Sequence, residues 1–299
     1  MRRDDPPEPA VHLLRASGVP VAWYAVQPKL PLTVSPRPYF HPVRTLHGVE
    51  VTEALPPDHP HHLGVSVAMP EAGEANFWGG RTYTREDGYR WLDNHGTQHH
   101  LTWHERDDEH IDESVGWYAP DGRTVLTERR TVGVHPLPGH AAWVFDLGFA
   151  LANNGPEPVE LRSPTCNGRP EAGYGGFFWR VPKEPGGLTV LTAEHDDVDA
   201  AYGTASAWLT MNGSDPDGRR WSLLFVQDDV NGRYDRWFVR TAANPGVGTC
   251  LAWARPVTLA PGDILRRRVR TAVLDGGAGR DRSLAVLREL TTTGTPPTA

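Results

Sequence analysis

The sequence has few cysteines and no long apolar run. Only two of its 299 residues are cysteines, Cys166 and Cys250, which excludes a disulfide framework and a cysteine-rich structural zinc site. Nowhere do eighteen apolar residues follow one another, as a membrane-spanning helix requires. The N-terminus has acidic residues directly after Arg2 and Arg3 and no apolar segment behind them, so no secretory signal is expected. We therefore expect a reduced, cytoplasmic protein.

The sequence also carries less positive than negative charge. Lys and Arg number 30 against 37 Asp and Glu, which gives a net charge of −7. This excess disfavours contacts with nucleic-acid phosphates and with anionic membranes, so we expect neither as a partner. No Gly-x-Ser-x-Gly motif, His-Glu-x-x-His motif or glycine-rich phosphate fingerprint is present. Acid–base chemistry by histidine and glutamate therefore remains as the economical option, with no cofactor predicted.

Turn residues and alternating apolar residues dominate the pattern of the chain. The 31 glycines and 28 prolines are scattered, which suits many short strands joined by turns such as Asn153-Asn154-Gly155 and Asn231-Gly232. Residues 141–151 alternate with period two, as a strand with one buried face does. Similar apolar runs predict further strands at residues 11–14, 21–26, 63–69, 99–106, 124–134, 208–211, 221–227, 248–257 and 264–274. We expect an all-β fold, a large antiparallel β-sandwich.

One segment near the C-terminus has a helical pattern instead. Apolar residues recur at helical spacing after Ser283, which can cap the first turn, so we expect one short helix over residues 283–290 on the outside of the sandwich. Residues 1–10 and 291–299 lack an apolar pattern and are expected to be disordered arms. No change in composition divides residues 11–290, which predicts a single domain.

Histidine is concentrated in two windows. Ten of the fourteen histidines fall within residues 41–62 and 95–110. Histidine titrates near neutrality and is the commonest metal ligand, so the windows indicate an acid–base site, a metal site or neither. In an extended chain His59 and His61, with Pro60 between them, lie on the same side and roughly 6.6 Å apart. That pair could chelate a metal or frame a substrate, whereas any single histidine could be structural.

A glycine-rich loop lies near the middle of the chain, within residues 163–180. It carries one carboxylate, Glu171, together with Arg169, Tyr174 and Arg180. Glycines allow close backbone approach, and a permissive loop furnished with charged and aromatic side chains is typical of a pocket for a polar ligand. The same segment could be an irregular turn whose last aromatic residues belong to the core.

Aromatic residues next to polar ones offer a surface for sugars. Trp78 lies in the segment Asn76-Phe77-Trp78-Gly79-Gly80, and Trp237 lies in a later segment that ends at Arg240. A flat ring against the C–H face of a pyranose, rimmed by side chains such as Asn94, is a common way to hold sugars. Each tryptophan taken singly is more often part of the core, and Arg240 could be a charge at the rim.

Four motifs occur in order along the chain, namely Arg37-Pro38-Tyr39-Phe40-His41-Pro42-Val43, Asp58-His59-Pro60-His61-His62-Leu63-Gly64, Asn76-Phe77-Trp78-Gly79-Gly80 and Gly168-Arg169-Pro170-Glu171-Ala172-Gly173-Tyr174-Gly175-Gly176. Together they resemble the bacterial PmoA-like domain family of unknown function over nearly the whole chain. The family's "methane oxygenase" label does not suit a chain without a membrane span. The resemblance implies a galactose-mutarotase-like supersandwich and a sugar oxidoreductase in the same pathway. Enzymes of that architecture often use histidine and a carboxylate in a concave sheet, which His59, His62 and Glu171 would supply.

The leading hypothesis is a carbohydrate-active enzyme that moves protons on a sugar or keto-glycoside by elimination, hydrolysis or epimerisation. Glu171 is the expected base, and His59 and His62 are the expected acid or electrophilic partners. His95 and Arg180 are expected to polarise a carbonyl or hydroxyl group. The expected substrate contacts are His41, Arg44, His61, Trp78, Asn94, Arg169, Tyr174, Arg180, Trp237 and Arg240.

Two alternatives stay open. One is a metal-dependent hydrolase or oxygenase, in which His59 and His61 bind a divalent metal with Glu171, Asp58 or His95 as a further ligand. The other is a non-catalytic sugar-binding module that kept the fold without the reaction.

Overall fold

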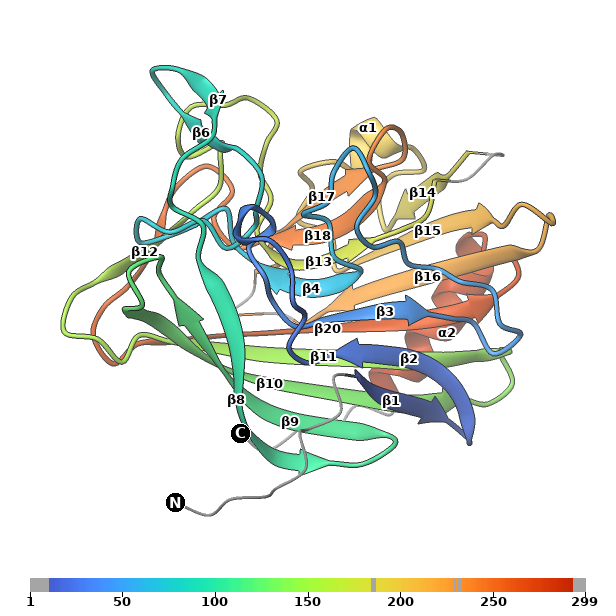
Figure 1. The fold of residues 1–299 in the computed structure, drawn as a ribbon. Coiled ribbons are helices and arrows are strands. Elements are labelled where there is room, and N and C mark those ends of the chain that lie inside the picture. The colour runs from blue at the N-terminus through green and yellow to red at the C-terminus, as the bar shows by residue number, and fades with distance from the viewer. Residues whose placement is uncertain (1–10, 184–186, 229, 231–232, 293–299) are drawn as a thin grey trace, which may run out of the picture.

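The computed structural model describes residues 11–183, 187–228, 230 and 233–292, and two large antiparallel sheets form most of it (Figure 1). Across the seven-stranded sheet lie, in order, β1 (Val11–Ala16), β2 (Val19–Ala25), β3 (Tyr39–Val43), β4 (Val65–Ala68), β13 (Gly176–Arg180), β18 (Gly246–Cys250) and β17 (Arg236–Arg240). Across the eight-stranded sheet lie β14 (Thr189–Thr192), β15 (Trp208–Ser214), β16 (Arg220–Gln227), β20 (Ile264–Asp275), β11 (Ala142–Ala152), β10 (Thr124–Leu137), β9 (His110–Tyr118) and β8 (Thr97–Arg106).

Smaller elements complete the described part of the chain. A three-stranded sheet consists of β19 (Val257–Leu259), β12 (Val159–Arg162) and β5 (Glu71–Ala72), and a hairpin consists of β6 (Thr82–Thr84) and β7 (Gly88–Arg90). The helical segments are η1 (Leu32–Val34), α1 (Val198–Ala201) and α2 (Arg280–Thr292). Among the described residues, no helix has both the length and the apolar character needed to cross a membrane.

Aromatic side chains join the two large sheets face to face. Phe40 on β3 meets Phe145 on β11 edge to face, with ring centroids 4.9 Å apart. Trp179 on β13 lies 5.7 Å from the same Phe145 ring and 5.6 Å from Phe225 on β16. All four rings are buried, and such pairs add about 0.5–1.5 kcal/mol each beyond the burial of their area. The predicted all-β antiparallel sandwich is therefore confirmed.

The C-terminal helix covers the outer face of the eight-stranded sheet. Val286 and Leu290 of α2 pack with outward-facing residues such as Leu224 on β16. The predicted position outside the sandwich is confirmed, but the helix begins at Arg280, so Ser283 is not its cap. Ser283 instead accepts a hydrogen bond from the buried Thr210 hydroxyl, at 3.0 Å.

Of the segments expected to be flexible or to form turns, one is partly helical and others lie outside the described residues. Residues 291 and 292, expected in a disordered tail, belong to α2. The expected arms at 1–10 and 293–299 and the expected turn Asn231-Gly232 lie outside the described residues.

A cluster of charged side chains is buried between the sheets. Arg130 on β10 donates to both carboxylate oxygens of Glu128, at 2.7 and 2.9 Å, and to the hydroxyl of Tyr24 on β2, at 3.0 Å. Tyr24 in turn donates to Glu113 on β9, whose other oxygen lies 2.6 Å from His100 Nδ1. One histidine of the second window therefore belongs to this cluster between the sheets.

The seven-stranded sheet has a second face that is not part of the main core. On β13, Phe177 and Trp179 point into the core, and Phe178 between them points to the opposite face. There Phe178 packs with Trp78 and with the partly buried Tyr174. This outer face carries the lining of a cavity, to which Trp78 and Tyr174 belong.

Candidate functional site

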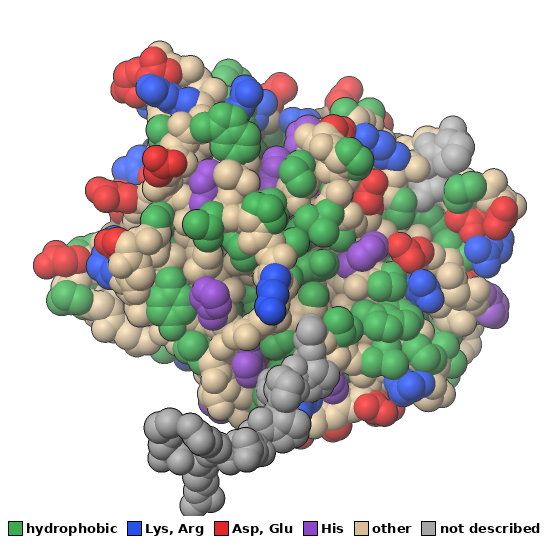
Figure 2. All heavy atoms as spheres, viewed as in Figure 1, with side chains coloured by type: hydrophobic (Ala, Val, Ile, Leu, Met, Phe, Trp, Pro, Cys, Tyr) green, Lys and Arg blue, Asp and Glu red, His purple; other side chains and the backbone are tan. Residues whose placement is uncertain are grey.

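A cavity of about 670 Å³ lies over the outer face of the seven-stranded sheet. This volume falls within the roughly 300–1,000 Å³ that small-molecule sites enclose. Figure 2 shows histidine side chains (purple) in the upper part of this view, in the hollow beside the β6–β7 hairpin. The lining residues are Thr33, Asp58, His59, Pro60, His61, His62, Trp78, Gly79, Gly80, Arg81, Tyr89, Trp91, Arg169, Glu171, Tyr174, Phe238, Arg240, Ala242, Ala243 and Asn244.

Three histidines of the first window line the cavity together. The segment is folded into tight turns, in which the His59 amide donates to the Pro56 carbonyl at 3.0 Å and the His62 amide donates to the His59 carbonyl at 2.9 Å. The rings of His59, His61 and His62 lie with their centroids only 4.8 to 5.4 Å apart. The extended geometry expected for His59 and His61 is therefore wrong, because the turns before β4 bring a third ring beside the pair.

Arg180 fixes the tautomer of His62. The Arg180 guanidinium is fully buried beneath the turn, donates to Glu53 at 2.6 Å and lies with Nη1 3.3 Å from His62 Nδ1. A guanidinium can only donate, so His62 Nδ1 accepts and the proton of the neutral ring is on Nε2. His62 is thus fixed as a hydrogen-bond donor through its other nitrogen.

The same guanidinium also orients His59 through an amide. Arg180 Nη1 donates to Asn244 Oδ1 at 3.3 Å, which leaves Asn244 Nδ2 to donate to His59 Nε2 at 3.2 Å. The proton of a neutral His59 is then on Nδ1, which lies 3.7 Å from a carboxylate oxygen of Asp58. One buried arginine therefore sets the tautomers of two cavity histidines.

Burial keeps two of the histidines neutral. It lowers the pKa of His61 to about 3, helped by the nearby His59 and Arg37, and it lowers the pKa of His62 well below its ordinary value. Desolvation disfavours the imidazolium form, and the neighbouring cationic groups add repulsion. At neutral pH both rings can accept or donate a hydrogen bond without carrying charge.

The low pKa of His61 predicts a loss of stability in mild acid. The unfolded chain takes up a proton near pH 6.5 whereas the folded chain does so near pH 3, so the stability is complete above pH 6.5 and falls as the pH drops toward 3. We expect the wild type to lose about 1 kcal/mol more than His61→Gln between pH 6.0 and 5.0. Urea denaturation at the two pH values measures this difference. Equal losses in both proteins would contradict the low pKa.

A backbone turn presents Trp78 to the cavity. Asn76 Oδ1 accepts hydrogen bonds from the amides of Trp78 and Gly79, at 2.9 and 2.8 Å. Gly80 follows with a φ of 69°, and a Cβ there would lie within 2.9 Å of the His61 ring. The two glycines after Trp78 therefore let the tryptophan and the histidine turn approach closely.

The buried Arg37 links the histidine turn, residues 56–62, to the turn that contains Trp78. Its guanidinium donates to the carbonyl of His61 at 2.9 Å and to the carbonyl of Trp78 at 3.1 Å. It also donates to the carbonyls of Val34 and Ser35 in the loop that contains η1. Arg37 thus fixes the position of the histidine turn relative to the Trp78 turn.

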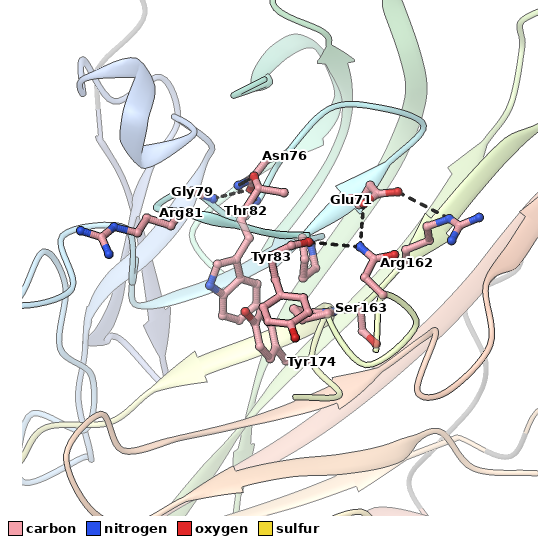
Figure 3. A pocket seen from close by; sticks show the side chains of 13 residues that line it. Glu71, Asn76, Gly79, Arg81, Thr82, Tyr83, Arg162, Ser163 and Tyr174 are labelled. Atoms are coloured by element: carbon pink, nitrogen blue, oxygen red, sulfur yellow. Dashed lines mark hydrogen bonds and ion pairs between the residues drawn. The ribbon is translucent and has the colours of Figure 1, made fainter. Parts of the chain in front are cut away.

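Figure 3 shows a second recess, lined by Tyr174 and Asn76 among others, and it shares Trp78 and Tyr174 with the lining of the larger cavity. Its volume is about 10 Å³, which is room for roughly one water molecule. An ion pair between Glu71 and Arg162, at 3.5 Å, closes its far side. This recess is therefore too small for a sugar, and the larger cavity is the candidate site.

Aromatic rings form a continuous wall between the histidine turn and the glycine-rich loop. Trp78 lies with its ring centroid 5.9 Å from His62, 4.8 Å from Phe178 and 4.6 Å from Tyr174. Tyr174 in turn packs at 5.5 Å against Phe238 of β17. Such a wall can hold the C–H face of a sugar ring.

Glu171 lies on the glycine-rich loop at the far end of this wall. Its residue is exposed and has a φ of 49°, the left-handed region that non-glycine residues seldom adopt. Its backbone carbonyl accepts a hydrogen bond from Arg240 at 3.1 Å, which anchors the loop. Because Glu171 and the three histidines line one cavity, the convergence expected from the sequence is present.

The structure divides the other expected contacts into two groups. Lining the cavity are His59, His61, His62, Trp78, Arg169, Glu171, Tyr174 and Arg240. Outside its lining are His41, Arg44, Asn94, His95, Arg180 and Trp237.

Trp237 was expected to contact the substrate, but it lies in the core and does not line the cavity. Its side chain is fully buried, and its indole N–H donates to the Ser206 carbonyl at 2.7 Å. Successive side chains of β17 point to opposite faces of the sheet. Trp237 and Val239 therefore lie in the core, and Phe238 and Arg240 line the cavity. Phe238, the next residue, therefore lines the cavity in place of Trp237.

The two residues expected to polarise the substrate, His95 and Arg180, are both buried and do not line the cavity. His95 is 6% exposed and lies with Nε2 2.7 Å from the carbonyl of Gly80, so it supports the Trp78 turn from behind. Asn94 accepts a hydrogen bond from Thr82 at 3.1 Å. Arg180, described above, acts through His62 and Asn244 and not on a ligand directly.

His41 and Arg44 belong to a different part of the sheet. His41 Nδ1 lies 3.0 Å from the Thr52 hydroxyl, and the Arg44 guanidinium stacks 4.9 Å from the centroid of Trp23. Both also approach Glu50, at 3.8 and 3.4 Å. Their contacts are structural and do not involve the cavity.

The sequence did not single out several residues that build the site. Glu53 and Asn244 belong to no motif, Arg37 belongs only to a motif of the family resemblance, and Phe238 lies in the segment that ends at Arg240, where the prediction chose Trp237. The alternation along β17 was the one signal that could have found Phe238. The alternative interpretation of the glycine-rich segment holds for its end, because Phe177 and Trp179 are in the core.

The described residues contain no group of three or more His, Cys, Asp or Glu side chains placed to hold a metal ion. His59 and His61 are close, but the other expected ligands do not complete a set with them. A divalent metal remains a prediction from the sequence alone.

Comparison with known proteins shows the family of the chain. The sequence profile of the "Family of unknown function (DUF6807)" matches residues 12–287. The chain belongs to this family. The expected membership in a family of unknown function is thus confirmed, and the PmoA-like label remains a prediction. No curated protein matches the chain.

Solved structures give distant likenesses. They include a candidate aldose 1-epimerase from Escherichia coli K12, 10% identical with a TM-score of 0.42 over 89% of this chain and 99% of that one. A galactose mutarotase related enzyme from Lactobacillus acidophilus is 8% identical with a TM-score of 0.44, over 88% and 97% of the two chains. The GH36 α-galactosidase AgaA from Geobacillus stearothermophilus is 11% identical with a TM-score of 0.41, over 89% of this chain and 41% of that one. At these values the likenesses say nothing of what this chain binds.

Proposed function

We propose that the chain is a carbohydrate-active enzyme that moves protons on a sugar or keto-glycoside bound in the cavity. The observation that supports this most is the meeting of His59, His62 and Glu171 along one aromatic-walled cavity, although more than a hundred residues separate Glu171 from the histidines. A pocket that combines an apolar wall with a few convergent polar groups is the usual form of a small-molecule site.

The sugar ring lies against the wall of Trp78, Tyr174 and Phe238. Flat aromatic faces complement the C–H face of a pyranose, and the polar rim satisfies the hydroxyl groups. The histidine turn then contacts one edge of the ring, and Glu171 contacts another.

Neutral His62 donates its Nε2 proton in a hydrogen bond to a carbonyl or hydroxyl oxygen of the substrate. A neutral imidazole is an effective electrophilic partner when its N–H donor is uncharged and held in one orientation. The hydrogen bond from Arg180 to Nδ1 holds the His62 donor in this way. The Glu171 carboxylate accepts the proton that leaves carbon or oxygen. The protonated Glu171 carboxyl group can return that proton, whereas His59 has its Nε2 occupied by the Asn244 amide and its Nδ1 buried beside Asp58. Elimination, hydrolysis and epimerisation all use this pair of proton transfers.

The test is conversion of a panel of free sugars, glycosides and 3-keto-glycosides followed by proton NMR in D₂O. We expect the wild type to convert a member of the panel or to exchange a carbon-bound proton for deuterium, and His62→Gln to do so at least ten-fold more slowly. His104→Gln is the matched control, because His104 is exposed on β8. Binding without conversion would favour a sugar-binding module, and equal rates in wild type and His62→Gln would remove His62 from the chemistry.

A further inference from the structure

The rim of the cavity concentrates positive charge in a chain that is acidic overall. Arg81, Arg169 and Arg240 all line the cavity, whereas the net charge of the chain is −7. Two carboxylates line it as well, Asp58 and Glu171. Asp58 is already paired with Lys183, at 3.0 Å. Glu171 is thus the one lining carboxylate whose charge is not already balanced by a salt bridge in the described part of the chain.

The three guanidinium groups are held by aromatic rings and not by carboxylates. Arg169 stacks 4.7 Å from the centroid of Tyr89, and Arg240 stacks 4.6 Å from that of Tyr202. Arg81 lies 5.9 Å from the centroid of Trp91. Within the described ranges none of the three has an ion pair, whereas most buried or half-buried arginines elsewhere in the described chain do, as Arg130, Arg180, Arg267 and Arg268 show.

Stacking leaves donor edges of these arginines available. Arg169 uses one nitrogen to donate to the Tyr89 hydroxyl at 2.5 Å, and Arg240 uses one to donate to the Glu171 carbonyl at 3.1 Å. A guanidinium has five N–H donors in a planar fork that fits carboxylate and phosphate oxygens in pairs. The rim therefore presents oriented and unneutralised donors to whatever occupies the cavity.

We infer that the carbohydrate bound in this cavity carries an anionic group, a carboxylate or a phosphate, which Arg169 and Arg240 bind at the rim. This inference rests on the proposed function, and it names the substrate class: a sugar acid or sugar phosphate. A charge-assisted hydrogen bond contributes about 1.5–3 kcal/mol, which corresponds to roughly ten- to hundred-fold in affinity. The arginines also attract the anion to the cavity before contact.

The test is calorimetric titration at pH 7.5 in about 20 mM salt with matched ligands: glucose, glucuronate and glucose 6-phosphate, and galactose with galacturonate. We expect an anionic member to bind at least ten-fold more tightly than its neutral partner, and the preference to shrink in 200 mM salt because the rim is exposed. The carboxylate and phosphate arms distinguish the two sources of charge.

Variants of the rim arginines test whether the anionic group binds at the rim. Arg169→Gln is expected to weaken binding of the anionic ligand about ten-fold and to leave the neutral one unchanged. Arg240→Gln also removes the donor that anchors the Glu171 loop, so it is expected to weaken binding of the anionic ligand more than that of the neutral one. Arg266→Gln, an exposed arginine on β20 in the other sheet, is the matched control and should change neither. Neutral sugars that bind as well as their acids would overturn the inference and leave the carbohydrate function standing. Failure of every ligand to bind would contradict both.

Discussion

Replacement of Glu171 by glutamine is expected to lower kcat on the order of 10²- to 10⁴-fold, the contribution of a positioned general base. Glutamine keeps the size and the hydrogen-bonding capacity of the side chain but cannot accept a proton. The loop is anchored through the Glu171 backbone carbonyl and not its carboxylate, so the substitution leaves the anchor to Arg240 intact. KM is expected to change little, because the loss is confined to the transition state.

Steady-state kinetics on the substrate found in the NMR panel measures this effect. Glu157→Gln is the matched control, since Glu157 is exposed on a loop and does not line the cavity. Its kcat should equal that of the wild type. Equal rates for Glu171→Gln and the wild type would remove the base from this position.

Replacement of Arg130 by methionine is expected to lower the free energy of unfolding by about 3–5 kcal/mol. Methionine fills much of the same space but leaves Glu128 buried without its partner, and it removes the donor to Tyr24. Both carboxylates of the cluster, Glu128 and Glu113, are fully buried. An uncompensated charge in this position is costly because no water can solvate it.

The neighbouring arginine offers a direct comparison. Arg129 is half exposed and pairs with Asp112 at 2.6 Å on the other side of the same strand. Arg129→Met should therefore cost at most about 1 kcal/mol. Urea denaturation of the two variants at pH 7 measures the difference. Equal losses would show that the cluster between the sheets does not contribute more than the half-exposed pair of Arg129 and Asp112.

Much of the sandwich could be predicted because alternation reports burial directly. The period-two pattern of 141–151 corresponds to β11, Ala142–Ala152, whose inward residues form the core. β13 was not predicted, since its residues Gly176–Arg180 are buried on both faces and do not alternate in polarity. The C-terminal helix was found from its spacing, but its start was displaced because Ser283 makes a tertiary hydrogen bond in place of a cap.

The site was predicted less completely, for reasons of three-dimensional packing. The sequence could indicate that histidines and a carboxylate are available, but not that turns bring His59, His61 and His62 into mutual contact. Their meeting with the Glu171 loop follows from the pairing of β4 with β13, which join segments far apart in the chain. Arg180 was expected to touch substrate, and only its burial under the turn shows that it positions His62.

The position of a bound carbohydrate in crystals of Glu171→Gln is the most direct measurement of the central claim. The account predicts density for a sugar ring stacked on the wall of Trp78, Tyr174 and Phe238, with an oxygen within hydrogen-bond distance of His62 Nε2 and another near residue 171. A sugar bound elsewhere on the molecule, or a ring in the cavity with no oxygen near His62, would contradict it.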